Sequence, residues 1–251
     1  MRILSIHAHP DDAEILAGGT LKLLADRGHH ITMVTMTPGD CGTNEYPPEE
    51  ISRIRKGEAA AAAALIGADY LWAGFRDLAI FNDDPSRRQV TAVLRQTRPD
   101  IVLTSAPSDY LCDHEMTHLL VRDACFGASA PNYQAPVMTP IKAIPHLYCM
   151  DPIGGHDRHG NPVTPDFIVD VSPVFQMKWD MLACHESQRN WLRAQHGMDD
   201  YMETMRAWTT RRGQQAGVAH GEGFIQYKGH PYPESPLLQE LLAGALAGTG
   251  R

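Results

Sequence analysis

The 251-residue sequence has few of the features that mark membrane, disulfide-rich or nucleic-acid-binding proteins. Its longest apolar stretch, residues 59–68, is too short to span a bilayer and runs directly into Asp69. The five cysteines are odd in number and form no Cys-x-x-Cys pair, so we expect a reducing, cytoplasmic location. Basic residues are outnumbered, 22 against 30 acidic ones, and the net charge of -8 disfavours a nucleic-acid partner.

What the sequence does contain is typical of one globular unit. Hydrophobic residues make up 43% and charged residues 21%, and no Gly/Ser linker, charge block or internal repeat divides the chain. We therefore expect a single domain over residues 1–251. Its core is expected in residues 1–126, and residues 127–251 are expected to complete it.

Apolar strand-like segments alternate with helical patterns in the first half of the chain. The expected strands cover residues 2–8, 31–36, 69–73 and 100–104, and the expected helices cover residues 13–27, 53–65 and 85–97 and continue from about residue 114. This alternation predicts an α/β fold with a doubly wound, mostly parallel, Rossmann-like sheet. Strands one and four then lie side by side, and a ligand binds at their carboxyl-terminal edge.

The second half of the chain carries weaker signals. Strands are expected at residues 141–149 and 166–171, and helices at residues 173–184 and 201–211. The segment between residues 152 and 165, rich in glycine, proline and histidine, is expected to form a surface loop near the site.

A first cluster of reactive side chains follows the first predicted strand, where residues 8–14 read AHPDDAE. Pro10 suits the first position of a helix, and Asp11 and Asp12 suit its first turn, so a purely structural helix start is one explanation. His9 and Asp12 are three residues apart, which can bring an imidazole and a carboxylate to one metal ion. Asp11 is then free to handle a proton.

A second cluster follows the fourth predicted strand, where residues 105–114 read SAPSDYLCDH. Because strands one and four are expected to be neighbours, His9, Asp12 and His114 can converge as three ligands of a catalytic zinc ion with one open position. A single histidine among 13 is more often a surface or packed residue. Two clusters at the edge where this fold binds its ligands favour a metal site.

These motifs resemble those of the LmbE-like or PIG-L-like zinc-dependent N-deacetylases. The resemblance rests on AHPDDAE at residues 8–14, GGT at 18–20, TPGD at 37–40, RKGE at 55–58, RPD at 98–100, Lys178 and HESQ at 185–188. It implies that a metal-activated water removes an N-acyl group, usually acetyl, from an amino sugar or related glycoside. It also implies that His9, Asp12 and His114 bind Zn²⁺ or another divalent metal, with Asp11 as the general acid/base.

The sequence departs from the family pattern at one position. Many family members carry a His-Pro-Asp-His block, whereas residues 111–114 here read LCDH. Leucine cannot donate a hydrogen bond to the oxyanion, so His185, His220 and Tyr110 are alternative donors beside the metal. Asp113 and His185 complete the candidate catalytic group, with Asp113 in a supporting role.

Three further polar residues, Arg55, Asp77 and Tyr110, are candidates for substrate binding, although each has an ordinary packing or surface explanation. The expected partner is a small N-acylated molecule, not a nucleic acid or a membrane. The resemblance also implies a possible homo-oligomer, a trimer or a hexamer.

Two other functions fit parts of the sequence. Residues 114–118 read HEMTH, an HExxH string in which His114, Glu115 and His118 could serve a zinc peptidase. No glutamate between Glu115 and Glu186 supplies a nearby third ligand, which disfavours this alternative. A non-catalytic nucleotide- or sugar-binding α/β module is the other alternative, although no GxGxxG or GxxxxGK[ST] motif is present.

Overall fold

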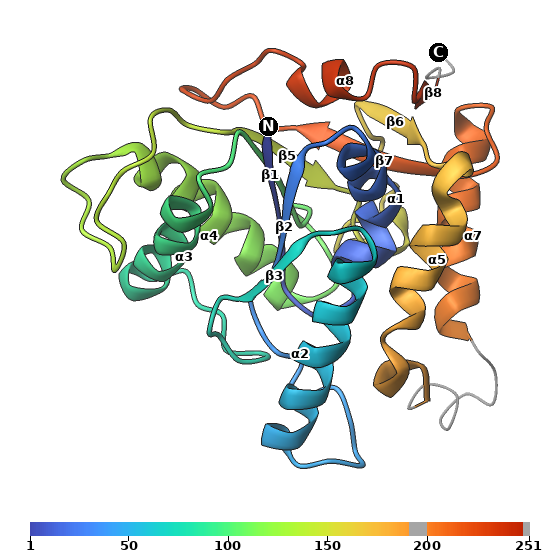
Figure 1. The fold of residues 1–251 in the computed structure, drawn as a ribbon, viewed down its shortest axis with the longest axis horizontal. Helices are drawn as coiled ribbons and strands as arrows, with labels where there is room; N and C mark the ends of the chain where they lie inside the picture. The colour runs from blue at the N-terminus through green and yellow to red at the C-terminus, as the bar shows by residue number, and fades with distance from the viewer. Residues whose placement is uncertain (191–199, 248–251) are drawn as a thin grey trace.

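The computed structural model describes residues 1–190 and 200–247, which form one eight-stranded sheet with helices on both faces (Figure 1). The strand order is β3-β2-β1-β4-β5-β7-β6-β8. Strands β3, β2, β1, β4 and β5 are parallel, and β7, β6 and β8 continue the sheet in antiparallel pairs. None of the described helices has the length and apolarity to cross a membrane.

The elements follow one another along the chain in the alternating order that the sequence predicts. The strands are β1 Arg2–His7, β2 His30–Thr35, β3 Asp69–Trp72, β4 Ile101–Thr104, β5 His146–Met150, β6 Phe167–Asp170, β7 Gly221–Gln226 and β8 Leu246–Ala247. The helices are α1 Asp12–Asp26, α2 Pro48–Leu65, α3 Asp84–Thr97, α4 Cys112–Ser129, η1 Ile153–Gly155, η2 Ser172–Val174, α5 Phe175–Ala183, α7 Asp200–Gln215 and α8 Leu237–Leu241.

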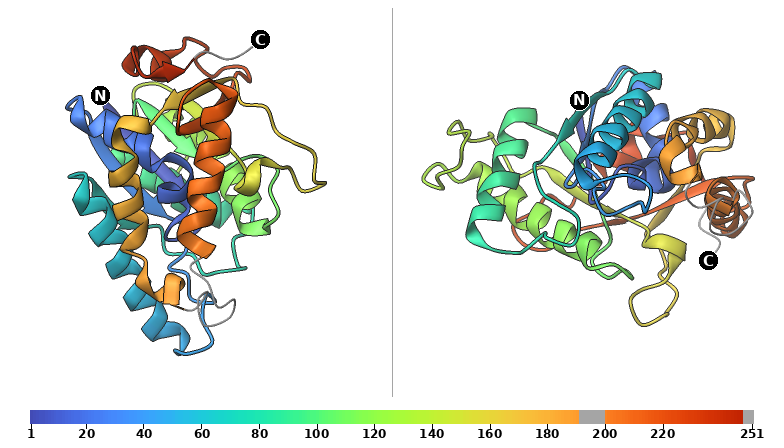
Figure 2. Two further views of the ribbon diagram at one scale, coloured as in Figure 1. Left: turned by 90° about the vertical axis from the view of Figure 1, so that its right-hand side faces the viewer. Right: turned by 90° about the horizontal axis from the view of Figure 1, so that it is seen from below.

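Two apolar cores lie on opposite faces of the sheet because successive strand side chains point to opposite sides. Ile3 of β1 packs in the core beneath α1 and α2, whereas its neighbour Leu4 packs in the core beneath α3 and α4. On the first face α5 and α7 stand side by side (Figure 2). Strands buried on both faces account for the continuous apolar runs in the sequence.

The predicted fold class is confirmed. Strand β1 pairs in parallel with β4 from Ile3↔Ile101 to Ile6↔Thr104, so the two clusters of reactive side chains emerge from neighbouring strands. The carboxyl ends of β1, β4 and β5 lie at one edge of the sheet. Because β7 is antiparallel to β5, its first residues lie at that same edge.

Several boundaries in the sequence-based prediction were wrong. The strand expected at residues 141–149 begins only at His146, because Pro145 has no N–H to donate and restricts the residue before it. Helix α2 begins at Pro48 rather than residue 53, with a proline at its first position. Strands β7 and β8 were not predicted, since the sequence GEGFIQ at residues 221–226 has two glycines and lacks a clear apolar alternation.

Candidate active site

The turn between β1 and α1 is held in a conformation that ordinary residues avoid. Asp11 has φ 107°, in the left-handed region, and the backbone N–H of His9 donates to Asp12 Oδ2 over 2.9 Å. Such strain in a non-glycine residue persists only where its surroundings fix it, and it is concentrated at functional sites. Here it turns the side chains of His9, Asp11 and Asp12 toward the edge of the sheet.

The structure brings His9, Asp12 and His114 together. One ligand atom from each lies within 4.8 Å of the other two. His9 Nδ1 is 3.7 Å from Asp12 Oδ2, and His114 Nε2 is 3.6 Å from Asp12 Oδ1. Two imidazole nitrogens and a carboxylate oxygen at this spacing fit a divalent cation such as zinc and leave a coordination position open.

Each of the two histidines is oriented by a second carboxylate on its other ring nitrogen. His9 Nε2 lies 3.2 Å from Asp113 Oδ2, and His114 Nδ1 lies 3.2 Å from Asp109 Oδ2. Metal-ligating histidines commonly use their second nitrogen in this way, which fixes the ring and leaves the first nitrogen free for the metal. Asp113 therefore supports His9, and Asp109 supports His114.

The charges of this group favour a cation at its centre. Burial opposes the charged form of His9, but Asp113 and Asp12 outweigh it and raise the pKa of His9 to about 10. Burial likewise opposes the charged form of His114, yet Asp12 and Asp109 raise its pKa. The same carboxylates that hold protons on these rings would stabilise a metal ion in their place.

Asp11 points into the same space without belonging to the ligand group. Its Oδ2 accepts hydrogen bonds from Tyr201 over 2.7 Å and from Arg55 Nη2 over 3.3 Å. Burial raises the pKa of Asp11, and Arg55 opposes that shift. Burial and Asp11 itself raise the pKa of Tyr201 well above its usual value, so the phenol keeps its proton and donates it.

The predicted substrate-binding residues all line a pocket of about 360 Å³ over the ligand group. Arg55 is buried and also donates to the carbonyl of Pro10, which braces the turn that carries Asp11. Asp77 accepts from two backbone N–H groups, those of Gly39 and Cys41. Tyr110 is 70% exposed at the rim and is the most accessible of the three.

His185 and His220, two of the proposed oxyanion donors, lie outside the described lining of this pocket. His185 is fully buried, and its Nε2 is 3.1 Å from Glu14 Oε1. His220 stacks on Phe175 with ring centroids 3.8 Å apart. Tyr110 can therefore contact a substrate directly, whereas His185 can influence the site only through its neighbours.

The geometry does not support the HExxH alternative. His118 is buried, with Nδ1 3.2 Å from the carbonyl oxygen of Ser105, and it does not join the ligand group. Burial lowers the pKa of His118 to about 4. Glu115 is paired with Arg158 and accepts the backbone N–H of Asp109.

Sequence reasoning missed Asp109, Tyr201 and Gln188, which the structure adds to the site. Asp109 stands in the SAPSDYLCDH string and Gln188 in HESQ, so both were visible as parts of motifs. Tyr201, 190 positions from Asp11, gave no local signal. The complete arrangement is an α/β fold with a His-Asp-His group that could hold a metal ion and a buried carboxylate beside it.

Comparisons with known proteins agree with that class. Residues 4–125 match the family model of the GlcNAc-PI de-N-acetylases, PIG-L. A diacetylchitobiose deacetylase of Thermococcus kodakarensis is 29% identical over 193 residues, 74% of this chain and 70% of that protein. A 4-oxalmesaconate hydratase of Pseudomonas putida is 26% identical over 195 residues, 74% of each chain. The N,N'-diacetylchitobiose deacetylase structure from Pyrococcus horikoshii has a TM-score of 0.78 at 26% identity, covering 94% of this chain and 88% of that one.

The match of residues 4–125 to the PIG-L family model confirms the resemblance predicted from the sequence motifs. The expected enzyme class, the amide hydrolases that include the deacetylases, is confirmed with it. The His-Asp-His group of the structure agrees with a metal-dependent member of that class.

Proposed function

We propose that this protein removes the N-acetyl group of an amino sugar or related glycoside, with His9, Asp12 and His114 holding a zinc ion. The observation that carries the proposal is the position of Asp11. Its carboxylate borders the pocket beside the ligand group, is held by Tyr201 and stays outside that group.

A divalent metal held by His9, Asp12 and His114 would supply polarisation of the amide carbonyl and would lower the pKa of water. Asp11 takes a proton from the water whose oxygen bonds to the carbonyl carbon, and it returns a proton to the nitrogen as the C–N bond breaks. The products are acetate and a free amine. The burial that raises the pKa of Asp11 brings this carboxyl closer to the range in which it can both accept and donate a proton.

Arg55 and Tyr201 both donate to Oδ2 of Asp11, which fixes the orientation of this carboxylate at the pocket. Tyr110 is the proposed donor to the oxyanion from the rim, in place of the histidine that Leu111 replaces. We assign His185 a positioning role, because it reaches the site only through Glu14 and through its charge near Asp11.

Acetate release from N-acetylglucosamine and N,N'-diacetylchitobiose by zinc-loaded protein tests this proposal. Asp11→Asn should lose activity by about two or more orders of magnitude and keep its zinc, whereas Asp12→Asn should lose zinc first. An Asp11→Asn protein with full activity, or no acetate release from any N-acetylated amino sugar by the wild type, would contradict it.

Hydration of a double bond is a second candidate, since one relative is a hydratase and uses water as its co-substrate. With a zinc ion bound, the described pocket lining carries the two positive charges of the metal and that of Arg55 against four carboxylates, Asp11, Asp12, Asp77 and Asp113, which leaves no excess of positive charge. This balance favours a neutral or cationic substrate over a polycarboxylate. An assay of water addition to unsaturated dicarboxylates, run beside acetate release, separates the two candidates.

We further propose that residues 1–251 act as one domain in the cytoplasm. The sheet that combines strands from both halves of the chain supports the single domain. A trimer or hexamer stays a prediction, to be tested by light scattering.

A further inference from the structure

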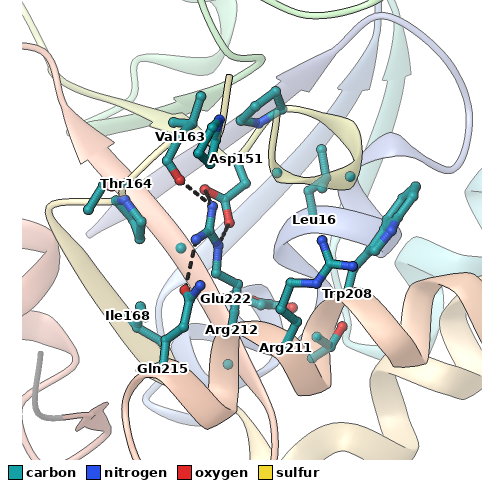
Figure 3. A pocket seen from close by; sticks show the side chains of 18 of the residues that line it. Leu16, Asp151, Val163, Thr164, Ile168, Trp208, Arg211, Arg212, Gln215 and Glu222 are labelled. Carbon is teal, nitrogen blue, oxygen red and sulfur yellow. Dashed lines mark hydrogen bonds and ion pairs between the residues drawn. The ribbon is translucent and has the colours of Figure 1, made fainter. Parts of the chain in front are cut away.

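We call the pocket over the His9, Asp12 and His114 group the catalytic pocket. A second cavity, which we call the side pocket, lies next to it and has a volume of about 540 Å³ (Figure 3). It opens between η1, the start of β7 and the last turns of α7. Because β7 begins where β5 ends, the side pocket lies at the same edge of the sheet as the metal centre. Its size is in the range of pockets that bind small molecules.

The two pockets share a wall. Ile15 of α1 lines both cavities, and in η1 the consecutive residues Ile153 and Gly154 line the catalytic pocket and the side pocket respectively. Asp109 ties this wall to the metal centre, since its Oδ2 accepts the backbone N–H of Ile153 over 3.0 Å and lies 3.2 Å from His114 Nδ1. A substrate longer than one ring can therefore extend from one cavity toward the other.

The buried charged groups of the side pocket, Asp151, Arg212 and Glu222, are paired, and Arg211, which also lines it, is exposed. Arg212 donates to both oxygens of Asp151, over 2.6 and 3.0 Å, and its remaining contacts are Val163 O and Gln215 (Figure 3). Glu222 is paired with the buried Lys178. The neutralised pairs give hydrogen-bonding edges without a buried unbalanced charge, and the exposed Arg211 adds N–H donors, which together suit a ligand with many hydroxyl groups.

The apolar surface of the side pocket includes an aromatic ring. Trp208 is half-buried on α7, and its ring lies against Gly154, where an added Cβ would be 3.8 Å away. Leu16 and Ile168 add aliphatic surface to the lining (Figure 3). A sugar ring has an apolar face of C–H groups and a polar edge of hydroxyls. The tryptophan ring can pack against the apolar face, and the paired charged groups can hydrogen-bond the hydroxyls.

We infer that the side pocket is a subsite for a second sugar ring, the part of the substrate beyond its N-acetylated ring. The inference rests on the proposed function for the identity of the first ring. It makes Trp208 a specificity-determining residue that favours a disaccharide over a monosaccharide.

Binding tests the subsite without turnover. In zinc-loaded Asp11→Asn protein, calorimetry should show N,N'-diacetylchitobiose binding about tenfold or more tighter than N-acetylglucosamine. Adding Trp208→Ala should weaken disaccharide binding about three- to tenfold and leave monosaccharide binding within about twofold. Thr164→Trp, a change at an exposed position of the pocket wall, should remove the advantage of the disaccharide.

Trp72→Ala is the matched control. Trp72 lies on β3, at the far end of the sheet, and lines neither pocket, so binding of both sugars should be unchanged. Equal affinity for the two sugars, or equal losses for both in Trp208→Ala, would overturn the subsite. Acetate release by the wild type is measured separately. If the wild type releases no acetate but still binds the disaccharide more tightly than the monosaccharide, the proposed function is refuted and the subsite is supported.

Discussion

Replacing Asp109 by asparagine is the most direct test of how the metal centre is built. Asp109 is buried, and its carboxylate lies 3.2 Å from His114 Nδ1 while accepting the backbone N–H of Ile153. Asparagine has the same shape and retains one acceptor oxygen, which can serve His114 and the Ile153 N–H but not also the Tyr110 N–H that donates to Asp109 Oδ1 over 2.6 Å. The substitution therefore removes the negative charge behind His114 and one hydrogen bond of the loop.

The expected loss of zinc affinity follows from the role of the negative charge of Asp109. Asp109 is one of the two carboxylates that raise the pKa of His114, and the same field stabilises a metal cation on Nε2. Losing a carboxylate partner of a ligating histidine typically lowers metal affinity 10- to 100-fold, or about 1.4–2.7 kcal/mol. His9 and Asp12 remain, so Asp109→Asn should still bind zinc, with lower affinity.

Zinc titration against a competing chelator measures this change, with Asp151→Asn as the control. Asp151 is also buried and paired with a cation, Arg212, but contacts neither metal-ligand histidine. Both variants should lose stability, and only Asp109→Asn should lose zinc affinity. Wild-type affinity in Asp109→Asn, or an equal loss in Asp151→Asn, would refute the assigned role.

Three further predictions follow from other buried groups. His9→Ala should lose zinc in elemental analysis while His118→Ala retains it, and the reverse result would restore the HExxH alternative. Burial lowers the pKa of His118 to about 4, below its unfolded value of 6.5, so its contribution to stability is present above pH 6.5 and is lost as the pH falls toward 4. Denaturant unfolding of metal-free protein should show this loss, about 3 kcal/mol, in the wild type relative to His118→Gln, and a constant difference between pH 7 and 4 would count against it. Lys178→Met leaves Glu222 buried and unpaired, and urea unfolding should show about 3–5 kcal/mol of destabilisation, against little change for Lys22→Met on the surface of α1.

The first half of the fold was predictable because its signals are local. The inner parallel strands β1, β2 and β4 are short apolar runs buried on both faces. The neighbouring position of β1 and β4 then follows from the doubly wound strand order, in which the chain returns to the other side of β1. The proximity of His9, Asp12 and His114 was predictable for the same reason, since each lies in the loop, or in the first turn of the helix, that follows one of these two strands.

The structure of the second half of the chain depends on contacts between residues far apart in the sequence, and such contacts leave no local pattern in it. Strand β7 has glycines because other groups occupy the space of a side chain: a Cβ at Gly223 would lie 2.6 Å from Asp151 Oδ2. Tyr201 reaches Asp11 from a helix 190 residues away. These residues are selected by their neighbours in space, so neither periodicity nor motif spacing reveals them.

The antiparallel end of the sheet also explains the GGT motif on α1. Glu222, on β7, accepts the backbone N–H groups of Gly19 and Thr20 over 2.9 and 2.8 Å, and Lys178 donates to the carbonyl of Ile15 over 2.7 Å. Gly19 is required there because a Cβ would lie 2.6 Å from Val171.

Helix α1 is thus bonded to the second half of the chain at Ile15, one turn beyond Asp12, and at Gly19 and Thr20, about two turns beyond it. The direction and height of its first turn depend on β7 and α5 as well as on β1. The stretch that matches the family model, residues 4–125, therefore contains the proposed reactive groups, whereas their alignment also depends on contacts from Lys178 and Glu222. We expect truncation after residue 125 to abolish metal binding even though all three ligands remain in the shortened chain.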